Sequence, residues 1–412
     1  MSSSPRPQLL ARVLGAGPTG ALAALALADA GWRVDLVDPL PAEALRERRR
    51  AYAFTHSSRR LLETLGLWQA LEPQLVPFAE LRLLDAGLPR WLRFGPADLP
   101  AGCRGPGRPV GWIGRHSHVM TLLLERLEGH PSVRLMLGPA ADGNPEPFAR
   151  TLPPSLEDAA PTPAGGPPGR QAPDLIVAAD GPGSPTRSAL GIGCWGWTYS
   201  QSCLTAELDL RGAAPSTAWE LLRPEGPTAL LPLEGERVQL VWSAPAARNR
   251  RREALEAPAF LDELAAILPE ELEPDALHEP PRAFPVALQL ARRLSRGQTV
   301  LVGESAHRSH PVGGQGLNLC WRDVAVLHRL ARRAAAGTLP PRRLGAAYGR
   351  RRWPDLLLIL IGTDLLVRVF SNRHPLTLPL RRIALALLAA ATPLRRLTLA
   401  LMTDGLPDLR RA

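Results

Sequence analysis

The sequence predicts an α/β protein in which a dinucleotide-binding domain is interrupted by an antiparallel β-sheet and followed by a helical region. Three observations support this prediction. A glycine-rich loop stands between two strand-like segments near the N-terminus, alternating apolar segments occupy residues 198–245, and an apolar pattern of helical period runs from about residue 319 to the end. With 412 residues and 45% hydrophobic composition, the chain can bury a sizeable core.

The first element is a βαβ unit. A short apolar segment, residues 11–14, precedes a GxGxxG loop and an alanine- and leucine-rich helical pattern, and a second strand-like segment ends at Asp38. Gly15 permits a tight turn, Gly17 lets the backbone approach a pyrophosphate, and Gly20 allows close packing of helix on strand. Asp38 lies eighteen residues after Gly20, where an acid can bind ribose hydroxyls. This Rossmann-like unit predicts a bound dinucleotide and leaves NAD and FAD as alternatives.

The dinucleotide-binding domain is expected to be discontinuous. Residues 139–173 are rich in proline, glycine and alanine, which predicts a flexible excursion from a first part spanning residues 1–197. The strand-like segments within residues 198–295 predict an inserted, mainly β-sheet domain that binds the substrate, and residues 258–268 are expected to be helical. Residues 296–350 return to the dinucleotide-binding domain.

Residues 351–412 predict C-terminal helices with two open interpretations. Arg381-Arg382 and Arg395-Arg396 lie fourteen residues apart, which on a continuous helix places them on one face, and Thr392-Pro393 is typical of an N-cap followed by proline. One interpretation is a peripheral element that binds an anionic membrane surface through these arginines. The other is packing on the core or at an interface between subunits.

Composition limits the partners. All 49 basic residues are arginine and the net charge is +10, but no nucleic-acid-binding motif is recognisable, so nucleic acid is not expected as a partner. The four cysteines lack metal-binding or disulfide spacing, which favours a reducing compartment. The N-terminus lacks a signal-peptide pattern and no uninterrupted apolar stretch spans a bilayer, so a cytoplasmic location is expected, with a peripheral membrane position left open.

Three motifs, in order, resemble the FAD signatures of class A flavoprotein monooxygenases: GAGPTG with Asp38, AADGPGSPTR, and VGESAHRSHPVGGQGLNL. The segments RRAYAFTHSSRRLLETLGLW, EGPTALLPL, VWS and FSN further resemble the ubiquinone-biosynthesis hydroxylases. The resemblance covers nearly the whole chain outside residues 139–173.

The resemblance implies FAD contacts along all three motifs. The residues that it implies are Gly15, Gly17, Pro18, Thr19, Gly20 and Asp38 for the ADP half, Arg50 and Arg115 near the cofactor, Asp180 and Gly181 in the second motif, Gly303 and Glu304 at the ribitol, and Pro311, Gly313, Gly314, Gln315, Gly316, Leu317 and Asn318 along the isoalloxazine ring. The chain departs from the family pattern at Glu304, where aspartate is usual, and at Cys320, where glycine is usual.

The implied activity is hydroxylation of a prenylated phenol in quinone biosynthesis, with one oxygen atom from O2 delivered through a flavin hydroperoxide. Electrons would come from NAD(P)H or a reductase partner, and a quinone-biosynthesis complex is a further implied partner. The alternatives are a flavin-dependent isoprenoid reductase or epoxidase, and a non-catalytic flavin-binding subunit. The sequence assigns no catalytic side chain beyond the flavin. His307 and His310 have the spacing of a metal pair but lack a third ligand pattern, so no metal is expected.

Overall fold

The computed structural model describes residues 8–48, 50–85, 91–105, 107–138, 172–372, 374 and 377–406. Residues 139–171, which make up nearly all of the predicted excursion, lie outside the described residues, and the excursion stays a prediction.

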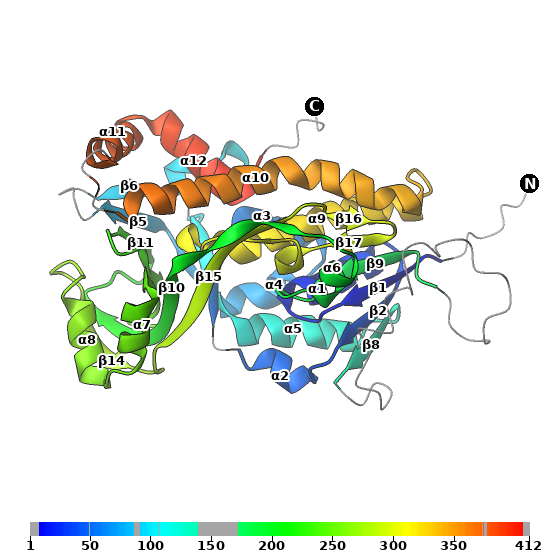
Figure 1. The fold of residues 1–412 in the computed structure, drawn as a ribbon, viewed down its shortest axis with the longest axis horizontal. Helices are drawn as coiled ribbons and strands as arrows, with labels where there is room; N and C mark the ends of the chain where they lie inside the picture. Colours follow the sequence, from blue (N-terminus) through cyan, green and yellow to red (C-terminus); the bar gives the residue numbers. More distant parts are fainter. Residues whose placement is uncertain are drawn as a thin grey trace, which may run out of the picture.

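The dinucleotide-binding half is built on a six-stranded sheet (Figure 1). In order across the sheet, its strands are β16 (Ser295–Arg296), β17 (Thr299–Leu301), β9 (Leu175–Ala178), β1 (Leu10–Leu14), β2 (Arg33–Asp38) and β8 (Val133–Leu137). All neighbouring pairs are parallel except β16 with β17. The expected βαβ unit is therefore present, and β9 and β17 return to the same sheet after the long intervening segments.

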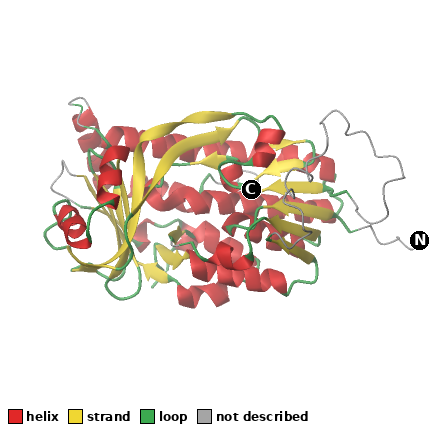
Figure 2. Ribbon diagram, turned by 60° about the horizontal axis from the view of Figure 1, so that its bottom comes forward, coloured by secondary structure: helices red, strands yellow, loops and turns green. Residues whose placement is uncertain are grey.

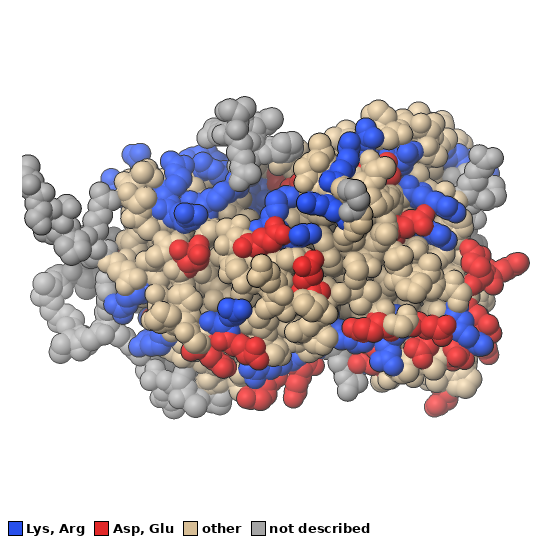
Figure 3. Space-filling model, turned by 180° about the vertical axis from the view of Figure 1, so that it is seen from behind, with Lys and Arg blue, Asp and Glu red and all other residues tan. Residues whose placement is uncertain are grey.

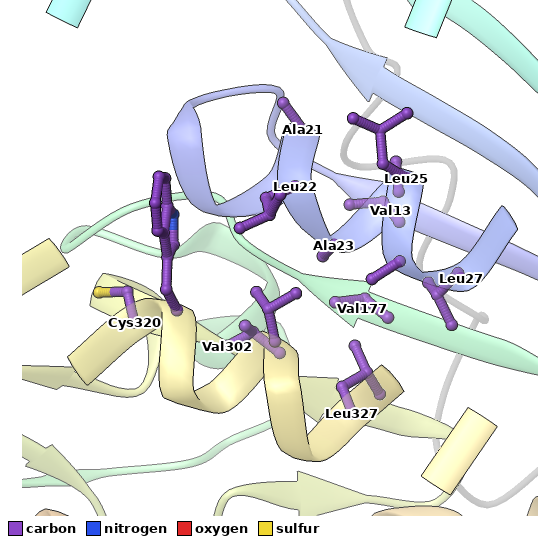
Figure 4. Close-up of a cluster of buried hydrophobic side chains, with 14 of the residues drawn as sticks. Val13, Ala21, Leu22, Ala23, Leu25, Leu27, Val177, Val302, Cys320 and Leu327 are labelled. Atoms are coloured by element: carbon purple, nitrogen blue, oxygen red, sulfur yellow. The ribbon is translucent and has the colours of Figure 1, made fainter. Parts of the chain in front are cut away.

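The core of this half lies between the parallel sheet and two long helices, α1 (Pro18–Asp29) and α9 (Gln315–Ala335). Every residue of α1 from Gly20 to Ala28 is buried, because the helix is covered by the sheet on one side and by other helices on the rest. Figure 4 shows Leu22 of α1, Val177 of β9 and Leu327 of α9 meeting in one apolar cluster. Alanines alternate with leucines along α1, which lets the neighbouring elements approach it closely.

The second sheet has nine strands and forms the curved wall seen in Figure 2. Its path runs through β18 (His307–Arg308), β15 (Arg282–Ala291), β10 (Cys194–Arg211), β13 (Arg237–Pro245), β12 (Thr228–Pro232), β11 (Thr217–Leu222), β5 (Glu80–Asp85) and β6 (Leu92–Phe94), and β14 (Glu273–Leu277) pairs with β10. The antiparallel insertion is confirmed in outline, with β11–β5 as a parallel pair.

The second sheet is larger than the sequence predicted. Strands β5 and β6 come from residues that the sequence analysis placed in the first part of the dinucleotide-binding domain. Pairing between β5 and β11 joins segments far apart in the chain, and such pairing depends on tertiary contacts that leave no local sequence signal.

A small sheet and short helices connect the two halves. The small sheet has the order β3 (Ala51–Phe54), β7 (Gly111–Arg115), β4 (Val76–Phe78). The other α-helices before residue 300 are α2 (Ala42–Arg46), α3 (His56–Thr64), α4 (Trp68–Leu71), α5 (His116–Glu128), α6 (Pro185–Ala189), α7 (Ala246–Glu253) and α8 (Ala257–Ala265). The short 3₁₀ helices are η1 (Glu72–Gln74), η2 (Pro96–Asp98), η3 (Ala101–Cys103), η5 (Gly303–Ser305), η6 (Val312–Gly314) and η7 (Pro341–Arg343).

Three C-terminal helices cover the molecule: α10 (Leu344–Phe370), α11 (Thr377–Ala390) and α12 (Thr392–Asp404). In Figure 1, α10 runs along one side of the whole molecule, and α11 and α12 lie at the end near β5 and β6. Within the described residues, no individual helix has both the length and the hydropathy of a membrane span. Only α11 and α12 taken together reach that threshold, and they are bent by 99°.

The predicted helix start at Thr392 is wrong by one residue. Ala391 is the N-cap, so Thr392 is the first helical residue and Pro393 the second. The prediction that the four arginines share a face is also wrong, because the 99° bend between α11 and α12 ends the continuous helix on which it depended.

Candidate active site

A cavity of about 1200 Å³ extends from the glycine-rich loops of the first sheet, past the second sheet, to the space beneath α10, α11 and α12. Most of the residues predicted to bind FAD line it. The predicted residues that line it are Gly15, Gly17, Pro18, Thr19, Asp38, Arg50, Asp180, Gly181, Glu304, Pro311, Gly313, Gly314, Gln315, Gly316, Leu317 and Asn318. Gly20, Gly303 and Arg115 are not among the lining residues.

The loop between β1 and α1 uses its three glycines for different reasons. Gly15 has φ +98°, and a Cβ there would lie 2.4 Å from the Ala179 carbonyl oxygen. A Cβ on Gly20 would lie 1.8 Å from the Gly15 carbonyl oxygen, so Gly20 is required for the close packing of α1 against the loop. A Cβ on Gly17 would meet no atom within 4 Å. The open space at Gly17 therefore lies where a pyrophosphate would approach the start of α1.

Asp38 lies beside this loop and lines the cavity. It is buried at the end of β2, and its Oδ2 accepts a hydrogen bond from the Ala16 N–H at 2.6 Å. Its Oδ1 accepts one from the Leu40 N–H at 2.8 Å. Each carboxylate oxygen retains a second lone-pair site, so Asp38 can also accept ribose hydroxyls from the cavity that it lines.

The second motif connects the first and third motifs. Asp180 accepts hydrogen bonds from Ser184 Oγ at 2.6 Å and from the Thr186 N–H at 3.0 Å. Arg187 is buried, and its guanidinium donates to the Ser305 carbonyl at 2.7 Å. The conformation of the second motif is therefore tied to η5, where the third motif begins.

The third motif forms a compact loop before α9. Gly313 and Gly314 have φ of +69° and +61°, a left-handed backbone that favours glycine. Asn318 holds this loop against β3, because its Nδ2 donates to the Ala53 carbonyl at 2.8 Å and to the Gly314 carbonyl at 3.0 Å. Its Oδ1 accepts from Ser58 Oγ at 2.7 Å. Asn318 thus positions the loop through bonds within the protein.

A buried charge network supports the third motif from behind. Asp323 on α9 accepts hydrogen bonds from the Gly303 N–H at 2.8 Å, His307 Nε2 at 2.7 Å and Arg352 Nε at 2.6 Å. Arg352 on α10 also binds Asp355 at 2.6 Å. Burial alone would raise the pKa of Asp323, but His307 and Arg352 lower it below its usual range.

The sequence analysis did not identify this network. The available signal was weak, because Asp323 follows Arg322 and Arg352 ends a run of three arginines, so neither stands out as an isolated charge in the sequence. His307 contacts Asp323, and His310 accepts a hydrogen bond from the Val312 N–H at 3.2 Å. Burial lowers the pKa of His310 to about 4, so this histidine is neutral at pH 7.

The two predicted arginines have different surroundings. Arg50 is exposed, lines the cavity and lies over the Phe284 ring, 5.5 Å from its centroid. Arg115 forms a bidentate ion pair with Glu207 of β10, at 2.5 and 2.9 Å. Its guanidinium is therefore held by the second sheet. Arg115 does not line the large cavity, and its contact with FAD stays a prediction.

The residues present fit FAD. Gly17, Gly181 and Gly316 all face open space, since a Cβ on any of them would meet no atom within 4 Å. Gln315 Oε1 is buried without a hydrogen-bond partner among the described residues, and it can accept an N–H from a ligand. Gln315 is also the first residue of α9, whose free N–H groups favour negative charge at that end.

Comparisons with known proteins agree with this geometry. The model of the FAD binding domain family matches residues 9–83 and 164–354. A protein of Rhodospirillum rubrum named ubiquinone hydroxylase UbiL is 33% identical over 365 residues, which are 87% of this chain and 81% of that protein. The 3-demethoxyubiquinol 3-hydroxylase of Escherichia coli is 29% identical, over 92% of this chain and 93% of that protein.

The fold also matches solved flavoprotein structures. The crystal structure of p-nitrophenol 4-monooxygenase PnpA from Pseudomonas putida superimposes with a TM-score of 0.71 at 18% identity, covering 95% of this chain and 96% of that one. Family match, whole-length similarity and fold lead to one conclusion: the chain belongs to the class A FAD-dependent monooxygenases and, within them, to the ubiquinone-hydroxylase family.

Proposed function

We propose that this chain hydroxylates the ring of a prenylated phenol in ubiquinone biosynthesis, using FAD, O2 and NAD(P)H. The observation that carries the proposal is the course of the cavity, which continues beyond the glycine-rich loops into a space lined mainly by apolar side chains. The names of the relatives from R. rubrum and E. coli support the same substrate class.

The cavity has a polar end and an apolar end. The polar end is formed by the three FAD motifs. The apolar end lies between β5, β6, β11 and β12 on one side and α10, α11 and α12 on the other, and its wall includes Leu81, Phe94, Leu231, Leu385, Leu388 and Leu399. A prenyl tail placed there would be removed from water, which contributes about 0.8 kcal/mol per buried CH₂.

Bound FAD supplies the activation of O2. The side chains and backbone of this chain supply the remaining requirements. Gly313 and Gly314 let the backbone lie close to a flat ring, Asn318 fixes that loop, and the second sheet covers the substrate side. The apolar side chains of the wall would limit the access of water and orient the phenol ring toward the cofactor loop.

The proposal predicts a specific metabolic block. A strain that lacks this gene should accumulate a prenylated phenol one ring oxygen short of the next ubiquinone precursor, because the hydroxylation step is missing. Mass spectrometry of lipid extracts measures the accumulating species, and re-expression of the unmodified gene serves as the control. Accumulation of an unsaturated prenyl product with a complete ring would favour the isoprenoid reductase instead.

We also propose that the three C-terminal helices bind an anionic membrane surface, mainly through apolar side chains. Arg381 is buried and pairs with Asp85 at 3.7 Å, and Arg395 pairs with Asp98 at 3.1 Å, so these two arginines face the protein. Arg382 is exposed on α11. The exposed apolar residues on these helices are Leu357, Leu358, Ile361, Leu365, Leu380, Ile383, Leu387, Leu394 and Leu397.

The charged side chains also bear on how this surface would meet a membrane. Figure 3 shows basic side chains mostly over the upper half of the molecule seen from behind, and acidic side chains mostly over its middle and lower part. The upper half is also the side on which Figure 1 shows α10, α11 and α12. Electrostatic attraction to anionic lipid would therefore add to apolar insertion at this surface.

Replacing Ile361, Leu365, Ile383 and Leu387 together by glutamine should lower binding to anionic vesicles by at least about tenfold. These side chains are 62%, 58%, 57% and 53% exposed, so their replacement should leave the fold and FAD content unchanged. Flotation with vesicles measures the effect, with exposed Arg382→Gln as the comparison for the charge contribution. Vesicle binding that is absent in the unmodified protein, or unchanged in the variant, would assign this surface to contact with another protein chain, such as a quinone-biosynthesis complex.

A further inference from the structure

Glu220 on β11 is a buried acid in the wall of the large cavity. Glu220 is only 8% exposed. No ion pair to Glu220 is found among the residues that the structure describes. Burial raises its pKa to about 7, although the nearby Gly313 backbone acts in the opposite direction. A buried carboxyl without a cationic partner destabilises a fold, and its presence in a cavity indicates a function.

The position of Glu220 separates it from the other acids of the cavity. Asp38, Asp180 and Glu304 lie on the dinucleotide-binding loops, and the first two are already bonded to backbone or serine groups. Glu220 lies on the substrate-side sheet and contacts Gly313, in the loop predicted to face the isoalloxazine ring. Among the described residues that line the cavity, it is the acid placed where the second sheet meets that loop.

We propose that the Glu220 carboxylate accepts the proton of the substrate's phenolic hydroxyl as oxygen is transferred to the ring. This inference rests on the proposed function. The O–H bond breaks, its electron pair moves into the ring, and the carbon ortho or para to the hydroxyl becomes a stronger nucleophile. That carbon forms the new C–O bond with one oxygen atom derived from O2. The O–O bond breaks, the second oxygen atom leaves as water, and NAD(P)H supplies the two electrons that this requires. Loss of the ring proton to solvent restores aromaticity, and Glu220 then releases its proton.

Glu220→Gln tests this role directly. Glutamine has nearly the same size and shape as glutamate and can still accept a hydrogen bond, so FAD content and its absorption spectrum should stay unchanged. The carboxylate that takes the proton is lost, and kcat should fall by about 10²-fold or more. In the unmodified protein kcat should rise with pH through about 7, as Glu220 ionises. That rise should be absent from Glu220→Gln. Glu236→Gln, an exposed acid in the β12–β13 turn, removes the same charge and should behave as the unmodified protein.

A stability measurement provides a readout that does not depend on turnover. The pKa of Glu220 is raised in the folded state, so ionisation above the unfolded value costs stability that increases until pH passes about 7. Glu220→Gln should therefore have a higher Tm than the unmodified protein at pH 8, and the difference should disappear at acidic pH near the unfolded pKa.

The outcomes are distinguishable. Wild-type kcat and an unchanged pH profile in Glu220→Gln would overturn the proton-acceptor role and leave the carboxylate as a partner of Gly313 only. Equal Tm values at pH 8 would show that Glu220 is not a costly buried charge, which also contradicts the inference. If the unmodified protein forms no hydroxylated product from any prenylated phenol, the proposed function itself fails, and this inference fails with it.

Discussion

Gly17→Val should abolish FAD binding while the protein remains folded. Gly17 is in an extended conformation with φ −63° and ψ 180°, which valine can adopt, and a Cβ there would meet no protein atom within 4 Å. The valine methyl groups would instead occupy the space that the pyrophosphate needs at the start of α1. We expect FAD affinity to fall by at least about 100-fold, equivalent to roughly 2.8 kcal/mol.

The measurement for Gly17→Val is the flavin content of the purified protein together with its Tm. Gly95→Val is the matched control, because Gly95 also has a negative φ of −131° and open space around its Cβ, but it lies outside the cavity lining. Full FAD content in Gly17→Val would contradict the assignment of the β1–α1 loop. If Gly95→Val fails to fold, valine at a glycine position with open space around it disturbs folding by itself, and the loss of FAD in Gly17→Val cannot be assigned to a blocked pyrophosphate site.

The second large effect is expected at Arg352. This buried guanidinium bonds to Asp323 and Asp355, both at 2.6 Å. Arg352→Met removes this cationic partner from both buried carboxylates, leaving His307 beside Asp323 and Arg322 beside Asp355. Breaking a buried ion pair by removing one member typically costs about 3–5 kcal/mol. Denaturant unfolding should show a loss of this order. Arg211→Met is the control: Arg211 is half-exposed in its ion pairs with Glu273 and Asp275, and its loss should cost less than about 1 kcal/mol.

The same network predicts the acid sensitivity of the fold. The pKa values of Asp323 and Asp355 are lowered, with Arg352 among the causes in both cases. Their stabilising contribution is therefore present above the unfolded pKa of about 3.9 and is lost as pH falls through the lower folded-state values. Arg352→Met should show a weaker loss of stability between pH 4 and pH 2 than the unmodified protein. An identical acid profile for both proteins would exclude the network as a source of this dependence.

The sequence predicted the parts of the fold that local patterns determine. The GxGxxG loop, the acid at the end of β2 and the glycine-rich approach to α9 each have a backbone requirement that restricts residue type, so they were recognisable in one dimension. The contribution of β5 to the second sheet was not predicted, because its partner β11 is distant in the chain. The sequence indicated a helix start at Thr392-Pro393 but not the 99° angle between α11 and α12, because a helical period does not determine how two helices meet.

The site was predictable to a similar extent. The residues predicted to face FAD belong to motifs, whereas Glu220 lies in a strand whose neighbours, Trp219 and Leu221, indicate only burial. Its importance depends on contact with Gly313, more than ninety residues away, and on the absence of an ion pair among the described residues. Asp323 and Arg352 likewise become a network only when α9 and α10 pack together. The roles of these charged residues depend on neighbours that only the tertiary structure brings together.

The most direct test of the account is the origin of the oxygen in the product. Purified, FAD-loaded protein is supplied with NAD(P)H and a prenylated phenol under oxygen-18 gas, and the lipid product is analysed by mass spectrometry. We predict a hydroxylated ring that carries one oxygen-18 atom, with no product when O2 is omitted. A product that lacks the label, or one with a saturated prenyl chain and an unchanged ring, would contradict the assignment of this chain as an aromatic hydroxylase.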